Sequence, residues 1–134
     1  MTLFDHVRGR PIEAGADTAW CDGPSPERSG WRERSATVRG EPIFAVDYVR
    51  CAYFRLGLVE QPFTSPTYQR RGLARVGLAA LRDEQPGLAW HTLGGHMSDS
   101  RGFWLAIAGE AAGGYQRRSV CKHLDIRVPV VENL

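Results

Sequence analysis

Residues 66–80 read PTYQRRGLARVGLAA, and this stretch decides how the middle of the chain is expected to fold. It begins at a proline and runs through two adjacent arginines into Gly72. Apolar residues then recur at spacings that place them on or near one stripe of a helix. These positions are Leu73, Val76, Leu78 and Leu81. We therefore predict a helix over 71–85, which Pro86 and Gly87 would close.

The start of this helix has the features of an anion site. The first backbone N–H groups of a helix have no partners within it, and the helix dipole adds partial positive charge there. Arg70 and Arg71 stand at the same point. Cations alone are mildly unfavourable at a helix start, so this pair favours a polyanionic ligand, most simply a phosphate or pyrophosphate. The alternative is a pair of solvated charges.

The sequence before the helix is typical of β-structure. β-Branched and aromatic residues and weak alternation predict three strands, near 34–38, 43–48 and 53–63. Pro62 lies within the third of them and indicates an edge, a bulge or a strand end, because proline cannot donate to a ladder.

The sequence after the helix predicts further α and β elements. We expect a short buried strand at 88–93, a second helix that Ser98 or Asp99 would cap and that ends near Ala112, and a strand at 124–131. The resulting order is β-β-β-α-β-α-β. It corresponds to a mixed α/β sheet whose middle units pack a helix across parallel strands.

The N-terminal part of the chain looks different. Residues 1–31 are rich in glycine and proline and show little periodicity. We predict an irregular segment there, with no more than a short strand near 18–21. Residues 32–134 are expected to form the folded domain.

Composition limits the classes of function. The 134 residues suit one domain, and a net charge of +2 does not favour nucleic acid as a partner. No apolar run approaches the roughly 20 residues of a membrane helix, and the first residues carry no apolar segment typical of a secretory signal. Three cysteines, an odd number, argue against a disulfide framework, so a reducing cytoplasm is the expected compartment.

The central stretch resembles the acetyl-CoA signature of the GNAT N-acetyltransferase superfamily. The core of that signature is Gln/Arg-x-x-Gly-x-Gly/Ala, preceded by a proline, and Gln69, Gly72 and Ala74 fill its three defining positions. Its context is similar too: a strand before, a helix after, then a strand and a second helix that bears Phe103 and Trp104. The resemblance covers roughly residues 43–109, half of the chain.

This resemblance implies a GNAT-type acyl-CoA fold with a mixed central sheet flanked by helices and a reduced N-terminal part. Acetyl-CoA would be the cofactor, with its pyrophosphate on the amides of 70–74. Its pantetheine arm would hydrogen-bond to exposed backbone of the strand before the signature, like an added strand. The implied cofactor-binding residues are Phe63, Thr64, Ser65, Gln69, Arg70, Arg71, Gly72, Leu73 and Ala74.

The implied activity is direct transfer of an acetyl group from coenzyme A to a primary amine. Glu60 is the candidate general base, with Asp47 as second choice, and the alternative for Glu60 is a surface carboxylate on an edge strand. Where the family has a general-acid tyrosine, Trp104 stands nearest, so Tyr115 is the substitute candidate. The alternative for Tyr115 is a turn aromatic that packs against the sheet. Overall, an inactive acyl-CoA-binding or interaction module remains the alternative function.

Two partner questions stay open at this point. The acceptor is expected to be an amine-bearing small molecule or protein. Because the N-terminal part is short, it stays open whether a second copy of the chain or a partner subunit completes the acceptor pocket.

Cys121 and His123 form a C-x-H pair, but zinc signatures show two paired groups of ligands. We therefore assign no metal.

Overall fold

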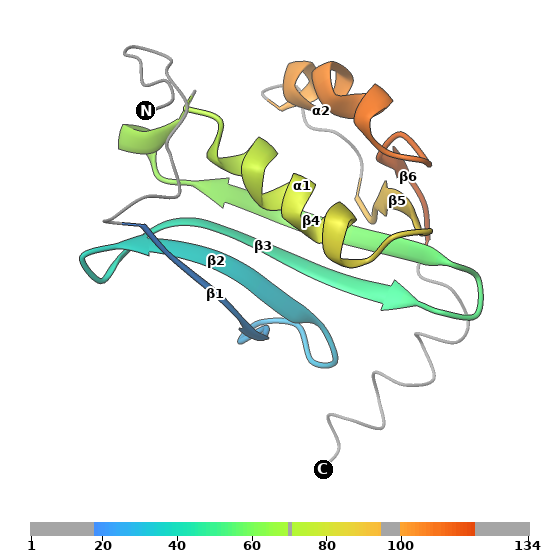
Figure 1. Cartoon of the computed structure of the whole chain (residues 1–134), viewed down its shortest axis with the longest axis horizontal. Coiled ribbons are helices and arrows are strands. Elements are labelled where there is room, and N and C mark those ends of the chain that lie inside the picture. Colours follow the sequence, from blue (N-terminus) through green and yellow to red (C-terminus); the bar gives the residue numbers. More distant parts are fainter. Residues whose placement is uncertain (1–17, 70, 95–99, 120–134) are drawn as a thin grey trace.

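A computed structural model describes residues 18–69, 71–94 and 100–119. In this part of the chain, six strands form one sheet in the order β1-β2-β3-β4-β5-β6, with two α-helices packed on it (Figure 1). The strands are β1 (Thr18–Pro24), β2 (Arg32–Val38), β3 (Glu41–Cys51), β4 (Leu56–Thr64), β5 (Ala89–Thr92) and β6 (Gln116–Arg117). The helices are α1 (Leu73–Glu84) and α2 (Arg101–Ile107), with short 3-10 helices η1 (Pro66–Tyr68) and η2 (Ala108–Glu110).

Strands β1 to β4 form an antiparallel meander. The β2–β3 turn carries Arg39 and Gly40 at φ values of 51° and 82°, the left-handed backbone that a tight hairpin requires. A second turn with Arg55 at φ 58° separates β3 from β4. The three strands predicted before the helix are therefore confirmed, and the boundary between the second and third lies at this turn.

Strand β1 confirms the short strand indicated near 18–21 and extends it to Pro24, so the prediction of an irregular segment up to residue 31 is wrong for these residues. Residues 18–24 pair with β2 along their whole length, from Thr18 opposite Val38 to Pro24 opposite Arg32. Trp20 packs against Phe44 with ring centroids 6.0 Å apart. An edge strand needs few apolar residues because one of its edges and part of one face meet solvent, so its periodicity in the sequence is weak.

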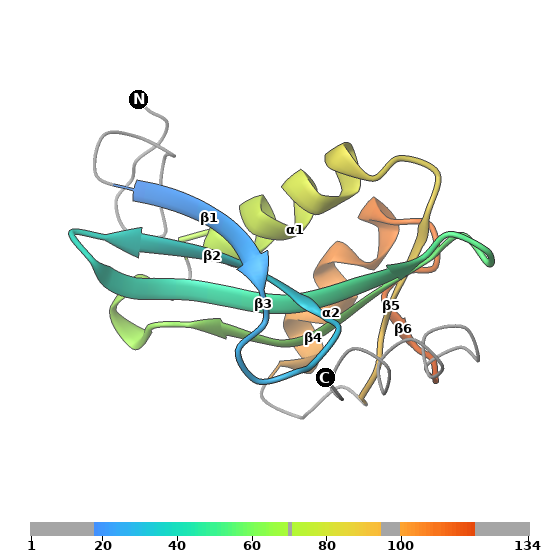
Figure 2. The same cartoon turned by 90° about the horizontal axis from the view of Figure 1, so that it is seen from below.

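The second half of the sheet is parallel. β4 connects through α1 to β5, and β5 connects through α2 to β6. Both crossovers step in the same direction across the sheet, so right-handed connections place both helices on one face, as Figure 2 shows for α1. The mixed sheet with helices across its parallel strands agrees with the predicted class.

The ends of the later elements differ from the prediction. The helix predicted over 71–85 is confirmed as α1, whereas α2 begins after Ser100. The predicted caps Ser98 and Asp99 and the predicted strand at 124–131 lie outside the described residues. Strand β6 was not predicted, because two exposed residues carry no periodicity. No helix in the described ranges combines the length and apolar character that a membrane span requires.

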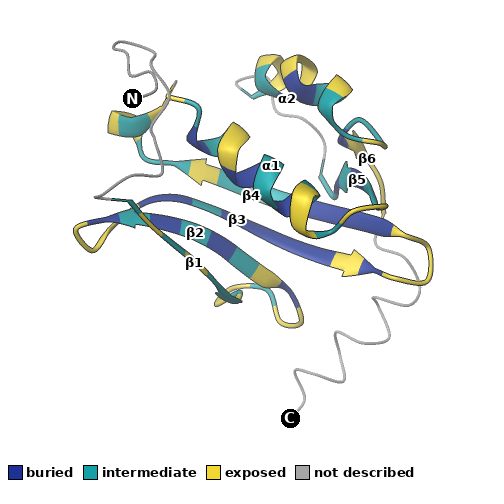
Figure 3. Ribbon diagram, in the orientation of Figure 1, coloured by how far each residue is buried: buried dark blue, intermediate teal, exposed yellow. Residues whose placement is uncertain are grey.

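The main core lies between the helices and the sheet. Its buried members include Phe44, Val46 and Val59 from the sheet, Leu73, Leu78 and Leu81 from α1, and Trp104 and Ile107 from α2. The opposite face of the sheet buries a second cluster of Trp31, Val49, Cys51, Leu56 and Leu58. Figure 3 shows that burial is greatest along β3 and the first half of β4, and that it falls toward the end of β4.

The apolar stripe of α1 departs from the prediction at one position. Val76 is 38% exposed, and Gly77 is buried in its place. A Cβ atom at Gly77 would lie 2.6 Å from the ring of Phe44. The missing side chain therefore lets α1 approach β3 closely.

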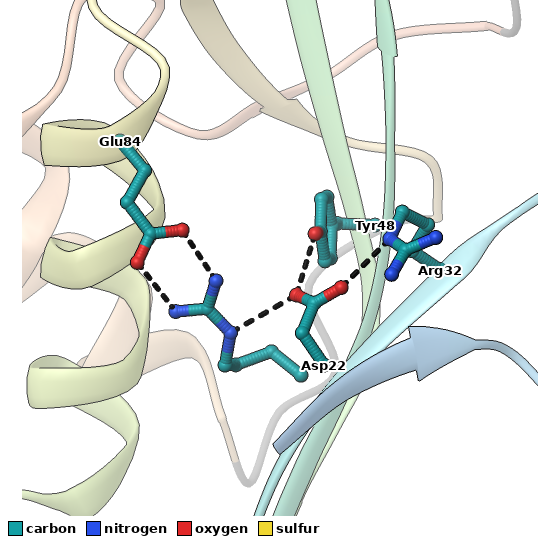
Figure 4. A network of polar contacts seen from close by, with 5 residues as sticks. Asp22, Arg32, Tyr48 and Glu84 are labelled. Atoms are coloured by element: carbon teal, nitrogen blue, oxygen red, sulfur yellow. Dashed lines mark hydrogen bonds and ion pairs between the residues drawn. The ribbon is translucent and has the colours of Figure 1, made fainter. Parts of the chain in front are cut away.

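A polar network ties β1, β2 and β3 to the last turn of α1 (Figure 4). Asp22 accepts hydrogen bonds from the Tyr48 hydroxyl at 2.6 Å, from Arg32 Nε at 2.7 Å and from Arg34 Nε at 3.1 Å. The guanidinium of Arg34 also donates twice to Glu84, at 2.5 and 3.2 Å. Because Arg34 is only 8% exposed, its charge depends on these two carboxylates.

The network makes stability depend on the protonation of Asp22. Burial alone raises the pKa of Asp22, but hydrogen bonds from Tyr48, Arg32 and Arg34 outweigh it, and the pKa is lowered below its ordinary value. A lowered pKa stabilises the fold above the pKa of the unfolded chain, and this contribution is lost as pH falls through the folded value.

We predict that Asp22→Asn lowers the free energy of unfolding by about 1–3 kcal/mol at neutral pH, since it removes a charged acceptor of three hydrogen bonds. The difference from wild type should shrink as pH falls below about 4. Urea titrations from neutral to acidic pH measure it. Asp83→Asn, an exposed position on α1, is the control; a wild-type to Asp22→Asn difference that does not change with pH contradicts the prediction.

Gly57 on β4 supports a second prediction. A Cβ atom there would lie 2.5 Å from the ring of buried Trp90, so Gly57→Ala should destabilise the fold by about 1–3 kcal/mol through overpacking. Gly23→Ala is the matched control, since its Cβ would meet no atom within 4 Å. Thermal unfolding of the two variants compares them, and equal midpoints would show that Trp90 moves aside freely.

Candidate functional site

Strand β4 separates from β5 halfway along its length. β4 pairs with β3 as far as Thr64, opposite Phe44, but it pairs with β5 only from Leu56 to Val59, opposite Thr92. A weak 3.4 Å hydrogen bond from Leu93 N–H to Val59 O marks the end of their contact among the described residues. Beyond Val59, no described strand covers that edge of β4 (Figure 1). We call this opening the β4–β5 fork.

A bulge lies in the free part of β4. Between the pairs Asp47–Glu60 and Ala45–Phe63, two residues of β4 oppose the single residue Val46. One of the two is Pro62, which has no N–H to donate, so the ladder is interrupted there. The bulge confirms one of the structures that Pro62 indicated.

The backbone at the end of β4 alternates between its two edges. Ser65 N–H donates to Ile43 O at 2.9 Å, so Ser65 is engaged with β3. Adjacent residues of an antiparallel strand direct their polar groups to opposite edges, so Phe63 also faces β3 and Thr64 faces the fork. Of the three predicted backbone contacts, the geometry thus favours Thr64.

The loop from β4 to α1 joins the fork to a helix start. Gln69 donates from Nε2 to Thr64 O at 3.0 Å, and Gly72 is the N-cap of α1 with a left-handed φ of 82°. The first α-helical hydrogen bond runs from Val76 N–H to Gly72 O, so the three N–H groups before Val76 have no helical partner. No acidic side chain lies in the first turn of α1.

The predicted phosphate ligands fall into three groups. Arg71 is exposed, with its guanidinium 5.5 Å from the ring centroid of Tyr68. Leu73 sends its side chain into the core and Ala74 is partly buried, so both offer backbone N–H groups only. Arg70 lies outside the described residues.

Glu60 lies at the closed end of the fork. Its Oε1 accepts a hydrogen bond from Gly94 N–H at 3.0 Å, directly beyond the end of β5. Its cross-strand partner is Asp47, and Arg28 lies near both carboxylates, with Nε 3.4 Å from Asp47 and Nη2 3.8 Å from Glu60. The Glu60 side chain is 17% exposed. Glu60 is therefore held in place, unlike a solvated glutamate on an edge strand.

Tyr115 is not at the fork opening. Its side chain is fully buried, and its hydroxyl accepts a hydrogen bond from Arg82 Nη1 at 2.9 Å. Its ring packs 5.3 Å from that of Trp104, and burial raises the pKa of its hydroxyl, with Arg82 opposing the rise. These contacts favour the packing alternative over the general-acid role.

Two residues near the fork were missed in the sequence. Arg28 lies in the loop before β2, where its N–H donates to Ser25 Oγ and its guanidinium lies 5.3 Å from the centroid of Trp31. Gly94 follows β5 and supplies the amide that fixes Glu60. Trp31, which flanks the loop, could have indicated in the sequence that the loop packs on the sheet. That Arg28 comes close to Glu60 depends on the register of the strands, which the sequence does not show.

The metal question concerns residues beyond this site. Cys121 and His123 lie outside the described residues. Within the described ranges, no three or more His, Cys, Asp or Glu side chains are grouped to hold a metal ion. Of the cysteines in the described ranges, Cys21 is exposed and Cys51 is buried.

No model of a known protein family matches this chain, and no curated protein is significantly similar to it.

Proposed function

We propose that the protein is an acetyl-CoA-dependent N-acyltransferase of the GNAT type, which transfers an acetyl group directly to a primary amine. One observation carries the proposal. The uncovered edge of β4 is followed, after a short loop, by the glycine-capped start of α1, and the carboxylate of Glu60 is held in place at the opposite, closed end of the fork. An extended thioester cofactor with a pyrophosphate needs these three features in this order.

Different residues of the chain bind the phosphates and the pantetheine arm of the cofactor. The amides of Leu73, Ala74 and Arg75 face the phosphates, with Arg71 adding charge from the loop. Thr64 offers its backbone N–H to the amide-bearing arm of the cofactor, as a strand does to an added strand, while its carbonyl accepts from Gln69. Gln69 fixes the loop to Thr64 and so sets the distance between the two contacts.

The chemistry follows from the position of Glu60. Coenzyme A supplies the acyl group as a thioester. The neutral amine attacks the thioester carbonyl, the C–N bond forms and the C–S bond breaks. Glu60, directly or through a water, takes the proton that the nitrogen loses, and the departing thiolate takes a proton from solvent.

Gly72 lies where the phosphates are proposed to bind, so a substitution there tests the site. Gly72→Glu places bulk and negative charge against the phosphates and should weaken coenzyme A binding at least about 100-fold, measured by calorimetry. Gly87→Glu is the matched control, because Gly87 has φ 86° and lies beyond the opposite end of α1. Retained affinity in Gly72→Glu, or an equal loss in Gly87→Glu, contradicts the phosphate site.

Glu60 and Tyr115, the two catalytic candidates, are expected to respond differently to substitution. Glu60→Gln should lower kcat by about 100-fold with little change in cofactor affinity, since the amide oxygen still accepts from Gly94 N–H but takes no proton. Tyr115→Phe should leave kcat within about twofold and lower the free energy of unfolding by about 1 kcal/mol, since it removes the hydrogen bond from Arg82 and no group at the fork. Thiol release at saturating substrate measures both variants, and the reverse pattern would make Tyr115 the catalytic group.

A catalytically inactive acyl-CoA-binding module is the second candidate, favoured by the burial of Tyr115 and its contact with Arg82. Such a module binds coenzyme A and loses it in Gly72→Glu, but releases no thiol with any amine. Turnover therefore separates the two candidates.

A further inference from the structure

A cavity of about 430 Å³ opens on the face of the sheet opposite α1 and α2. Its apolar lining comes from Ala45, Val46, Pro62 and Phe63, and its acidic lining from Glu27, Glu33 and Asp47. Pro62 and Phe63 belong to the free half of β4, so one wall of the cavity is the strand that borders the β4–β5 fork.

Three carboxylates cross the sheet in a row beside this cavity. Glu33 on β2 lies opposite Asp47 on β3, and Asp47 lies opposite Glu60 on β4. Directly opposed residues in an antiparallel pair bring their side chains within about 5 Å, and like charges there destabilise the sheet. The row runs from the cavity to the closed end of the fork.

One basic side chain among the described residues pairs with this row. Arg28 approaches Asp47 and Glu60 at 3.4 and 3.8 Å, both longer than a good charged hydrogen bond. Its Nε is buried and has no hydrogen-bond partner in the described part of the chain. Glu33 and Glu27 have no ion pair with a described basic residue, so negative charge remains in excess at the cavity.

The titration of Glu33 agrees with this excess. Burial raises its pKa, and the charges of Asp47 and Glu27 raise it further. A cation that entered the cavity would offset all three effects.

The other lining group suits an alkyl chain. Phe63 is 50% exposed although it is large and apolar. Its ring can pack on methylene groups or hold a cation against its face. The cavity therefore combines an apolar wall with an anionic rim.

We propose that this cavity binds the acceptor, and that the acceptor is an aliphatic amine with a second positive charge, such as a diamine or polyamine. The second ammonium lies among Glu27, Glu33 and Asp47, the methylene chain lies along Phe63, and the reacting amine reaches Glu60 at the fork. The inference rests on the proposed function, since it names the substrate class of that site. One amine proton passes to Glu60 as the amide bond forms.

The test compares 1,5-diaminopentane with 1-aminopentane, which share a chain length and differ by one ammonium. Calorimetry measures the binding of each, with and without saturating coenzyme A, and thiol release gives each KM. We expect the diamine to bind about tenfold tighter or more, with a correspondingly lower KM.

The variants are Glu33→Gln and Glu27→Gln, which keep side-chain size and leave the Arg28 contacts in place. Each should weaken diamine binding by about threefold to tenfold and leave the monoamine unaffected. Asp83→Asn, on the helix side of the sheet, is the control for a lost charge and should change neither affinity.

Two outcomes overturn the inference: equal affinity for the two amines in every condition, or a diamine preference that both cavity variants retain. The underlying function fails separately. If coenzyme A does not bind, the proposed function is wrong; if it binds and the diamine shows no preference, only the acceptor class is wrong.

Discussion

The arrangement of this protein depends on a mismatch in length: one edge of β4 is paired with a neighbouring strand over a much longer stretch than the other. One edge is satisfied by β3 along nearly its full length, while the other is covered by β5 for only four residues. A parallel neighbour must return through a crossover, and β5 ends at Thr92. The amide of Gly94 then bonds to a side chain of β4, Glu60, so the separation of the strands is itself held by a hydrogen bond.

The same mismatch places chemically different groups around one strand. Backbone donors and acceptors face the fork, the helix start lies at its open end, and carboxylates gather on the face away from the helices. The pairing of β4 thus separates the regions proposed for cofactor and acceptor. Glu60 is the point where they meet.

The sequence predicted local features better than features that depend on register. Gly72 and the periodicity after it predicted α1, because a left-handed cap and an apolar stripe are short-range properties. Pro62 likewise indicated the bulge. Strand β1 was indicated only as a short strand near 18–21, and its full length was missed, since its pairing with β2 and not its own composition holds it in the sheet.

In the candidate site, too, residues marked by a local motif were predicted from the sequence, and residues brought together by strand register were not. Gln69 was implied by the resemblance to the GNAT signature and Gly72 also by its place before the helix pattern, and both lie in the loop beside the fork. The row of Glu33, Asp47 and Glu60 could not be predicted from the sequence, because those residues become neighbours only when three strands pair in this register. Tyr115 was singled out from its position after α2, but its hydroxyl is engaged by Arg82, a contact that no sequence pattern predicts.

The polar network around Arg34 has a consequence for the order of folding. Its contact with Glu84 joins residues 50 positions apart, and Tyr48 reaches Asp22 across 26 positions. Closing such long loops costs chain entropy before any contact forms. The hairpins and α1 can form from nearby residues, so we expect the docking of α1's last turn onto the first strands to complete folding late and to limit its rate.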